Sequence, residues 1–170
     1  AYVPSVAGDY IRYYDTISNT DTVATTVTVA YYCNFGSDSS TTTWGTHSGD
    51  TIVDTTDAWF GTDDSDGTGD PSLAHAYFEA GAPVTPTSYS VPTGSSTTTY
   101  SVTIDPGATV AFVIFGVQAT NRANARTQIV SIVGDIASYT ADLSAVQVGQ
   151  IVNWTVDGDM DGFTRSEGDC

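Results

Sequence analysis

One segment restricts the fold more than any other in this sequence. Residues 109–120 read TVAFVIFGVQAT and are apolar at both odd and even positions. Side chains of a β-strand alternate between the two faces of a sheet, so a short run of this kind indicates a central strand that is covered on both faces. We therefore expect a facing sheet on one side of residues 109–120 and another packed element on the opposite side.

Three further segments alternate in the way that strands do. Residues 9–18, 22–35 and 99–105 each place apolar side chains at mostly even spacing, and the second of them is rich in β-branched residues. The sequence SNTD predicts a hairpin turn between the first two, and PGA predicts a turn before residue 109. The fold class predicted is mainly β: an antiparallel β-sandwich of roughly 8 to 10 strands with Greek-key or jelly-roll connections.

The remaining segments are less regular. Residues 37–49 and 88–100 are rich in Thr and Ser and are broken by Gly and Pro, which predicts long surface loops and edge strands. Residues 72–79 (SLAHAYFE) suit either a strand or a helical turn.

One or two short helices are expected near the C-terminal end. Asn121 is a good helix cap, and the apolar residues after it predict a helix over residues 122–133. A second short helix is plausible over residues 144–154, although the β-branched residues in both segments would also suit strands. The predicted organisation is a β-sandwich domain over residues 1–154 and an acidic, calcium-binding tail over residues 155–170.

The charge balance excludes several classes of partner. The 170 residues include 20 acidic and only 4 basic side chains, all of them Arg, for a net charge of -16. Binding to phosphate requires clustered Lys and Arg, so we expect no nucleic-acid partner and no anionic membrane surface. No apolar run approaches the roughly 20 residues that a membrane-spanning helix needs. Without lysine, a Schiff base or a lysine isopeptide bond cannot form either.

The strongest chemical signal is the C-terminal sequence DGDMDGFTRSEGDC. Aspartates at its positions 1, 3 and 5, followed by Gly at position 6, let three carboxylates converge on one cation, and the backbone carbonyl at position 7 adds a ligand. The predicted calcium ligands are Asp157, Asp159, Asp161 and Phe163, with Glu167 or Asp169 closing the shell because position 12 is Gly168. Calcium is preferred because all these ligands are hard oxygens. The alternative is a solvated acidic tail.

A second acidic cluster occupies residues 63–70 (DDSDGTGD). Asp64, Asp66 and Asp70 surround a Gly-rich loop and could form another oxygen cage for calcium. The alternative is an Asp-Gly turn in which the carboxylates accept hydrogen bonds from backbone amides.

The chain contains two cysteines, Cys33 and Cys170. An even number in a secreted chain favours a disulfide, which would tie the acidic tail to a strand of the domain. Whether this bond joins residues of one chain or of two chains is left open.

Few residues suggest catalysis. His47 and His75 are far apart in sequence, and neither GxSxG nor HExxH is present, so we expect no enzyme. Trp44 and Trp59 could stack on sugars, but a role in packing is favoured for both. Asn153 begins the triplet NWT, which matches the acceptor pattern for N-glycosylation and is a weak signal.

The C-terminal motif resembles the metal-binding repeat, of form DxDxDGF/YxxxEGDC, found in large bacterial cell-surface and secreted proteins. Upstream, YIRYYDTISNT, WFGTDDSDGTGDPSLAH and VQATNRANA resemble a β-rich module that precedes such repeats. The family repeat often has a second cysteine where this sequence has Ser166, so the resemblance leaves Cys170 to reach Cys33 or another chain. Members of the family usually continue into further repeats, and the resemblance therefore suggests a processed product or a subunit whose tail a neighbour completes.

These features predict a non-catalytic, extracellular structural protein. It would be stabilised by calcium and would act as a cell-surface module or as the repeating subunit of a filament; the start at Ala1 suits removal of a signal peptide. Residues 1–8 (AYVPSVAG) could add as a strand to the open sheet edge of a second copy, giving a homopolymer, or could form the first strand of their own domain. The alternative function is a calcium-dependent carbohydrate-binding or adhesion module with a glycan ligand.

Overall fold

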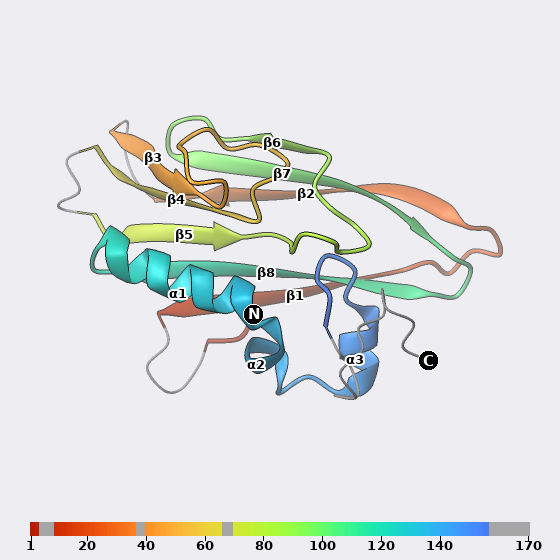
Figure 1. Ribbon diagram of the computed structural model, residues 1–170. Helices are drawn as coiled ribbons and strands as arrows, with labels where there is room; N and C mark the ends of the chain where they lie inside the picture. Colours follow the sequence, from red (N-terminus) through yellow and green to blue (C-terminus); the bar gives the residue numbers. More distant parts are fainter. Residues whose placement is uncertain (4–8, 37–39, 66–69, 157–170) are drawn as a thin grey trace.

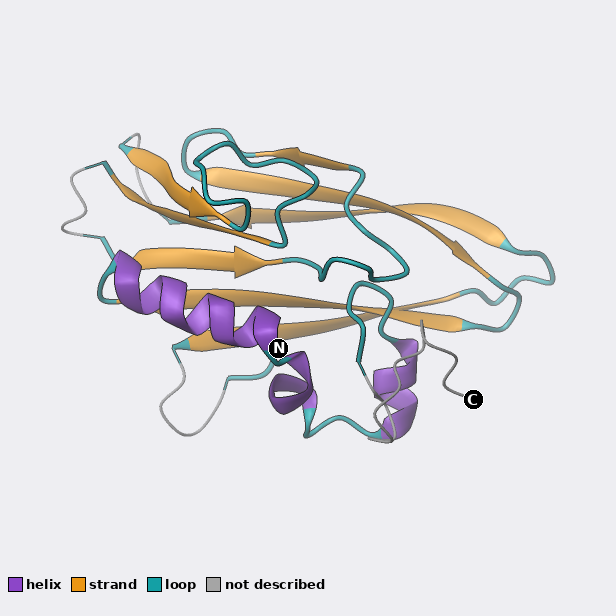
Figure 2. Cartoon of the chain, viewed as in Figure 1, coloured by secondary structure: helices purple, strands orange, loops and turns teal. Residues whose placement is uncertain are grey.

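The computed structural model describes residues 1–3, 9–36, 40–65 and 70–156, which form two facing antiparallel β-sheets with helices on one side (Figures 1 and 2). The strands are β1 (Tyr10–Ser18), β2 (Thr25–Asn34), β3 (Thr41–Thr46), β4 (Trp59–Asp64), β5 (Ser72–Ala76), β6 (Ser88–Ser90), β7 (Ser95–Ile104) and β8 (Thr109–Ala119). The helices are α1 (Arg122–Gly134), α2 (Ile136–Thr140) and α3 (Ala145–Gln150). The predicted β-sandwich with short helices near the C-terminal end is confirmed.

The two sheets differ in width. The larger sheet has the order β1-β8-β5-β4-β3 and the smaller sheet has the order β2-β7-β6. Because β1 pairs with β8 and β2 pairs with β7, the first two strands pair with the last two. The predicted hairpin between β1 and β2 is therefore wrong: the turn passes from one sheet to the other. Asn19 holds this crossing, since its side-chain amide donates to the carbonyls of Val23 and Ile104, both at 2.8 Å.

Strand β8 is buried on both faces, as its sequence predicts. On the inner face, Phe112 and Ile114 belong to the core between the sheets, together with Tyr100, Val102 and Ile104 of β7. On the outer face, a second core is formed by residues of β4, β5, β8, α1 and the segment after α3; it includes Trp59, Phe115, Ile129, Ile132 and Trp154. The larger sheet is thus the middle layer of three (Figure 1).

Helix α1 matches its predicted range closely. It begins after Asn121, whose side-chain oxygen accepts a hydrogen bond from the Asn124 amide at 2.9 Å, and it packs on β4, β5 and β8. The second predicted helix was too long, since α3 ends at Gln150 and residues 151–154 extend into the core. Helix α2 was not predicted. No helix in the described ranges is both long enough and apolar enough to cross a membrane.

The segments rich in Thr and Ser became edge strands only in part. β3 and β6 do lie at sheet edges, as predicted. In contrast, β7 is the middle strand of the smaller sheet, because its residues alternate between buried and exposed positions and bury Tyr100, Val102 and Ile104. Residues 72–79, for which a strand or a helical turn was expected, begin with strand β5.

Three arginines fasten the helical layer to the outer face of the larger sheet. Arg12 of β1 is 3% exposed and makes two hydrogen bonds, of 2.6 and 2.7 Å, to the Asp142 carboxylate after α2. This pairing lowers the pKa of Asp142. Arg122 at the start of α1 contacts Asp63 of β4 at 3.0 Å. The Arg126 guanidinium lies over the rings of Trp44 and Trp59, at 5.4 and 5.5 Å from their centroids.

Asn153 joins three parts of the structure from a fully buried position. Its side-chain amide donates to the carbonyls of Tyr77 and Val113, both at 2.7 Å, and its side-chain oxygen accepts from the Val113 amide at 2.9 Å. Every polar atom of the side chain is therefore engaged, and the side chain is 0% exposed. In the folded domain Asn153 is a structural residue that no glycosylating enzyme could reach.

Replacing Asn153 should destabilise the domain strongly. Asn153→Ala leaves one amide and two carbonyl groups buried without these partners, so we expect the free energy of unfolding to fall by about 3 kcal/mol. Urea denaturation followed by tryptophan fluorescence measures this loss. Asn124→Ala, at an exposed position of α1, is the matched control and should change stability by less than about 1 kcal/mol. Equal losses in the two variants would contradict this role for Asn153.

Candidate functional site

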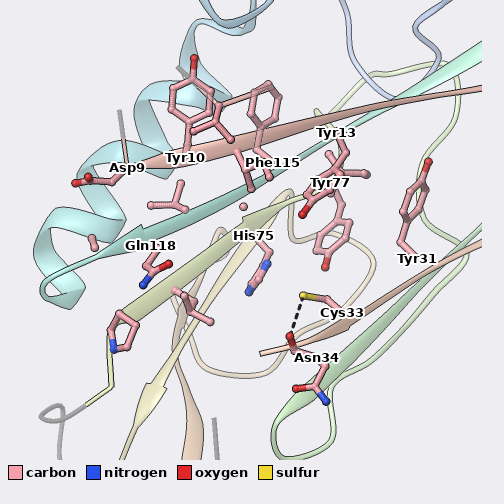
Figure 3. A pocket seen from close by; sticks show the side chains of 18 of the residues that line it. Asp9, Tyr10, Tyr13, Tyr31, Cys33, Asn34, His75, Tyr77, Phe115 and Gln118 are labelled. Atoms are coloured by element: carbon pink, nitrogen blue, oxygen red, sulfur yellow. Dashed lines mark hydrogen bonds between the residues drawn. The ribbon is translucent and has the colours of Figure 1, made fainter. Parts of the chain in front are cut away.

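A groove lies between the two sheets, and we call it the inter-sheet groove. It encloses about 900 Å³ and is lined by the first half of β1, the second halves of β2 and β8, and β5 with its flanking residues. Figure 3 shows these strands with the side chains that project into the space between them. A volume of this size lies within the range of protein ligand sites.

The floor of the groove is a depression in the inner face of the larger sheet. Strand register places Ile11, Gly116 and His75 in one row across β1, β8 and β5. Gly116 lacks a side chain where its neighbours have one, and a Cβ atom at this position would lie 3.3 Å from Cγ2 of Ile11. The glycine therefore lets the Ile11 side chain lie close against β8.

One wall of the groove is β2, and no described strand pairs with the backbone along its outer edge. The Phe35 amide, just after β2, donates to the Gly94 carbonyl at 2.9 Å, so odd-numbered residues of this strand direct their backbone groups toward β7. Hydrogen-bonding direction alternates along an antiparallel strand. The even-numbered residues, Thr28, Ala30, Tyr32 and Asn34, therefore present their backbone N–H and C=O groups at the edge beside the groove.

The mouth of the groove exposes large apolar side chains. Val3, Tyr13 and Tyr32, which all line it, are 66%, 42% and 68% exposed. Next to them, Tyr2 pairs with Arg12 at the free edge of β1 through two backbone hydrogen bonds of 2.7 and 2.9 Å. The Arg12 guanidinium also lies 4.8 Å from the centroid of the Tyr2 ring. Clustered exposed apolar side chains often mark an interaction site.

His75 is the least satisfied polar group in the groove. It is 7% exposed, and its Nε2 atom has no hydrogen-bond partner within the described part of the chain. It lies among aromatic rings, with Phe35 and Phe60 at centroid distances of 5.1 and 5.4 Å. Burial lowers the pKa of His75 to about 4, so the imidazole is neutral near pH 7. A neutral imidazole nitrogen can form one hydrogen bond with an occupant of the groove.

Cys33 projects into the groove from β2, opposite His75 (Figure 3). Burial raises the pKa of its thiol, which keeps the thiol protonated and weakly nucleophilic. Burial also raises the pKa of Tyr77, to about 12, and that of Tyr31, beside Asp15. The ionisable groups around His75 are therefore held in their neutral forms.

The predicted metal ligands are only partly within the described residues. Asp157, Asp159, Asp161, Phe163, Glu167 and Asp169 lie outside them, as does Asp66. Asp64 and Asp70 do come together, on a small cavity of about 110 Å³ that is also lined by Thr62. Within the described ranges, no three His, Cys, Asp or Glu side chains are arranged to hold a metal ion. Calcium binding at either cluster stays a prediction.

Asp63, next to the predicted cage, has a structural role that the sequence did not reveal. It is 4% exposed, and its carboxylate accepts hydrogen bonds from Ser72 at 2.5 Å, from Arg122 at 3.0 Å and from the Asp64 amide at 2.8 Å. The Arg122 guanidinium also donates to the Asp64 carbonyl at 2.5 Å. These bonds fix the end of β4 against α1.

The cysteines, tryptophans and His47 that the sequence singled out can also be located. Cys33 forms no disulfide within the described part of the chain, and its predicted partner Cys170 lies outside that part. Trp59 is 3% exposed and Trp44 is partly buried, with their rings 5.9 Å apart under Arg126, as expected of packing residues. His47 is exposed just after β3, which is separated from the strand of His75, β5, by β4.

The groove itself was not predicted from the sequence, although one signal pointed to it. Gly116 interrupts the apolar run of residues 109–120, and a lone glycine inside a strand often marks a close approach of another backbone or a ligand.

Burial of His75 predicts a specific pH dependence of stability. Its pKa is about 4 in the folded state and 6.5 when unperturbed, so the unfolded chain binds the extra proton as the pH falls through this interval. The contribution of His75 to stability is present above pH 6.5 and is lost toward pH 4, by about 3 kcal/mol. Urea denaturation at pH 7 and pH 4 measures how much unfolding free energy each protein loses between the two pH values. This loss should be smaller by the same amount in His75→Phe than in the wild type. The exposed control His47→Phe should keep the wild-type loss; parallel profiles for all three proteins would contradict the assignment.

The inter-sheet groove, its exposed rim and the acidic motifs are the features that bear on function. Among the described residues, the groove combines an apolar floor, one buried nitrogen without a hydrogen-bond partner and the outer edge of β2. Comparison with protein-family models, curated protein sequences and solved structures found no significant match.

Proposed function

We propose that this chain is a non-catalytic structural protein of the extracellular space that associates with further copies of itself through strand addition. The observation that carries the proposal is the inter-sheet groove. There, the edge of β2 and part of the larger sheet are left without a covering strand by the described residues, and exposed apolar side chains surround the opening. An open edge of this kind supports association by main-chain hydrogen bonds.

The N-terminal segment is the element proposed to join the copies. Tyr2 pairs with Arg12 at the edge of β1, which supports the ability of this segment to act as a strand. In this structure the pairing is made within one chain, the competing possibility for residues 1–8. Transfer of a terminal strand from its own chain to an identical one is a low-cost route to oligomers.

Calcium is proposed to stabilise the assembly through the acidic motifs at residues 63–70 and 157–169. A chain with 20 acidic and 4 basic side chains repels its own copies, and bound cations would reduce that repulsion. Abundant Ser, Thr and Gly and the motif resemblance support an extracellular site of action. A calcium-dependent glycan-binding module is less well supported, since Trp44 and Trp59 pack under Arg126 instead of forming an open platform.

Association through the rim of the groove should be sensitive to a buried charge. Val3→Asp places a carboxylate at the mouth, and we expect the dissociation constant for self-association to rise by about tenfold or more, because burying an unpaired charge is costly. Sedimentation-velocity and light-scattering titrations in calcium buffer measure the change. Val23→Asp is the matched control, since Val23 is 65% exposed and lies outside the groove lining. A wild-type chain that stays monomeric at all concentrations would refute the proposed function.

Calcium dependence has its own test. Replacing Asp159 and Asp161 by Asn removes two charged ligands of the predicted loop, so the melting temperature in calcium buffer should fall by several degrees, while the value in chelator should be unchanged. Thermal denaturation and isothermal titration with CaCl₂ provide the two readouts. Unchanged stability together with unchanged calcium uptake would show that the tail is not the site.

A further inference from the structure

We infer that the acceptor of the N-terminal segment is the free edge of β2, so that residues 1–8 of a second copy lie in the inter-sheet groove as a fourth strand of the smaller sheet. This inference rests on the proposed function, that copies associate through this segment, and names the site at which they do so. It also predicts which face of the segment enters and in which direction the strand runs.

The edge of β2 lacks the protection that edge strands usually have. Natural sheets block edge pairing with charged side chains, prolines, bulges or short strands. β2 is ten residues long (TTVTVAYYCN), pairs with β7 in an unbroken register, and contains neither a charged residue nor a proline. In a chain with 20 acidic side chains, this absence leaves β2 open to pairing.

The space beside β2 matches a strand in position and length. The smaller sheet has three strands facing five, and the inner face of β1 at Ile11 and Tyr13 lines the groove instead of lying under a strand. A fourth strand next to β2 would cover these residues. The groove is lined by β1 from Tyr10 to Asp15, which at about 3.3 Å per residue corresponds to a strand of roughly six residues.

The N-terminal segment suits this space in charge and in size. None of the side chains of AYVPSVAG is charged, so the segment avoids repulsion from Asp9 and Asp15 at the rim of the groove. Its eight residues are long enough to fill the groove as a strand. Val3 of the same chain already lies at the mouth, which shows that a residue of this segment is compatible with the rim.

The floor selects one face of the segment. Gly116 has no side chain to separate an incoming strand from the neighbouring His75, and the Nε2 atom of His75 has no hydrogen-bond partner within the described residues. Ser5 is the one small hydroxyl-bearing residue of the segment. With Ser5 facing His75, Ala1, Val3 and Ala7 share the inward face, while Tyr2, Pro4 and Val6 face outward.

Proline then fixes the direction of the strand. Inward-facing residues of β2 direct their backbone groups toward β7, away from the groove. In a new strand that runs parallel to β2, the residues whose side chains face inward would direct their N–H and C=O groups toward β2. The residues whose side chains face outward would direct these groups away from β2. Pro4, an outward residue, has no N–H to donate and is tolerated on that free side. An antiparallel strand with Ser5 inward would place Pro4 against β2, so the parallel direction is expected.

Cysteine cross-linking between copies tests the inference directly. Cys33 lies in the groove on β2, and Cys170→Ser removes the chain's other cysteine. In that background, Ser5→Cys places a thiol on the inward face of the incoming strand, within disulfide reach of Cys33, whereas the control Val6→Cys places it on the outward face. Oxidised glutathione should convert most of the Ser5→Cys protein into disulfide-linked multimers on a non-reducing gel, should do so for little of the Val6→Cys protein, and should have no such effect when Cys33→Ser is added.

Each outcome has a defined meaning. If light scattering shows association but Ser5→Cys gives no link that depends on Cys33, the acceptor is not β2, although the proposed function stands. If Val6→Cys links better than Ser5→Cys, the face and direction are wrong. A disulfide formed only within one chain means that the chain's own segment fills the groove, which overturns the inference. If the chain does not associate at any concentration, the proposed function itself fails.

Discussion

The burial of β8 on both faces is the constraint on which the rest of the structure depends. An eleven-residue strand with apolar side chains on either side of the sheet must be covered twice, by the smaller sheet on the inner face and by α1 and the segment after α3 on the outer face. The outer cover is complete enough to bury Ile129, Ile132 and Trp154 fully. The inner cover is narrower, with three strands against five. The inter-sheet groove is the consequence of that difference in width.

Scarce positive charge is concentrated where the layers meet. Each of the three described arginines links the helical layer to the larger sheet. Arg12 does so through a bidentate ion pair, Arg122 through a contact with the buried Asp63 carboxylate, and Arg126 by lying over two tryptophan rings. In these settings Arg combines charge with packing, which Lys does not do as well. Acidic side chains outnumber the arginines by 20 to 4, so long-range repulsion between copies follows from the same composition. Any association must therefore use uncharged surface, and the rim of the groove and the edge of β2 provide it.

Local patterns predicted local structure well and predicted strand partners poorly. Alternation predicted β1, β2 and β7, a continuous apolar run predicted β8, and Asn121 predicted the start of α1, because these patterns depend on neighbours in sequence. The prediction of a hairpin between β1 and β2 was wrong because a tight turn can also connect strands of different sheets. Which of the two connections forms depends on the hydrogen bond from Asn19 to Ile104, 85 residues away. Asp63 was missed for the same reason, since its partner Arg122 lies 59 residues further along. The groove could not be predicted because it is an absence of covering residues, and Gly116 was its one trace in the sequence.

The two strand edges at the groove differ in a way that bears on how copies would join. The edge of β1 is occupied at Arg12 by Tyr2 of the same chain, and the Arg12 side chain reinforces this pairing by lying over the Tyr2 ring. The edge of β2 has no such cover among the described residues, and its free backbone groups flank an apolar floor with an unpartnered imidazole nitrogen. If Tyr2 of a second copy paired with the edge of β1, it would only replace the identical pairing that Tyr2 of the same chain already makes. A strand added to the edge of β2 would form new backbone hydrogen bonds, cover the inner face of β1 and supply a hydrogen-bond partner for His75. The net gain in free energy from association therefore comes from pairing with β2.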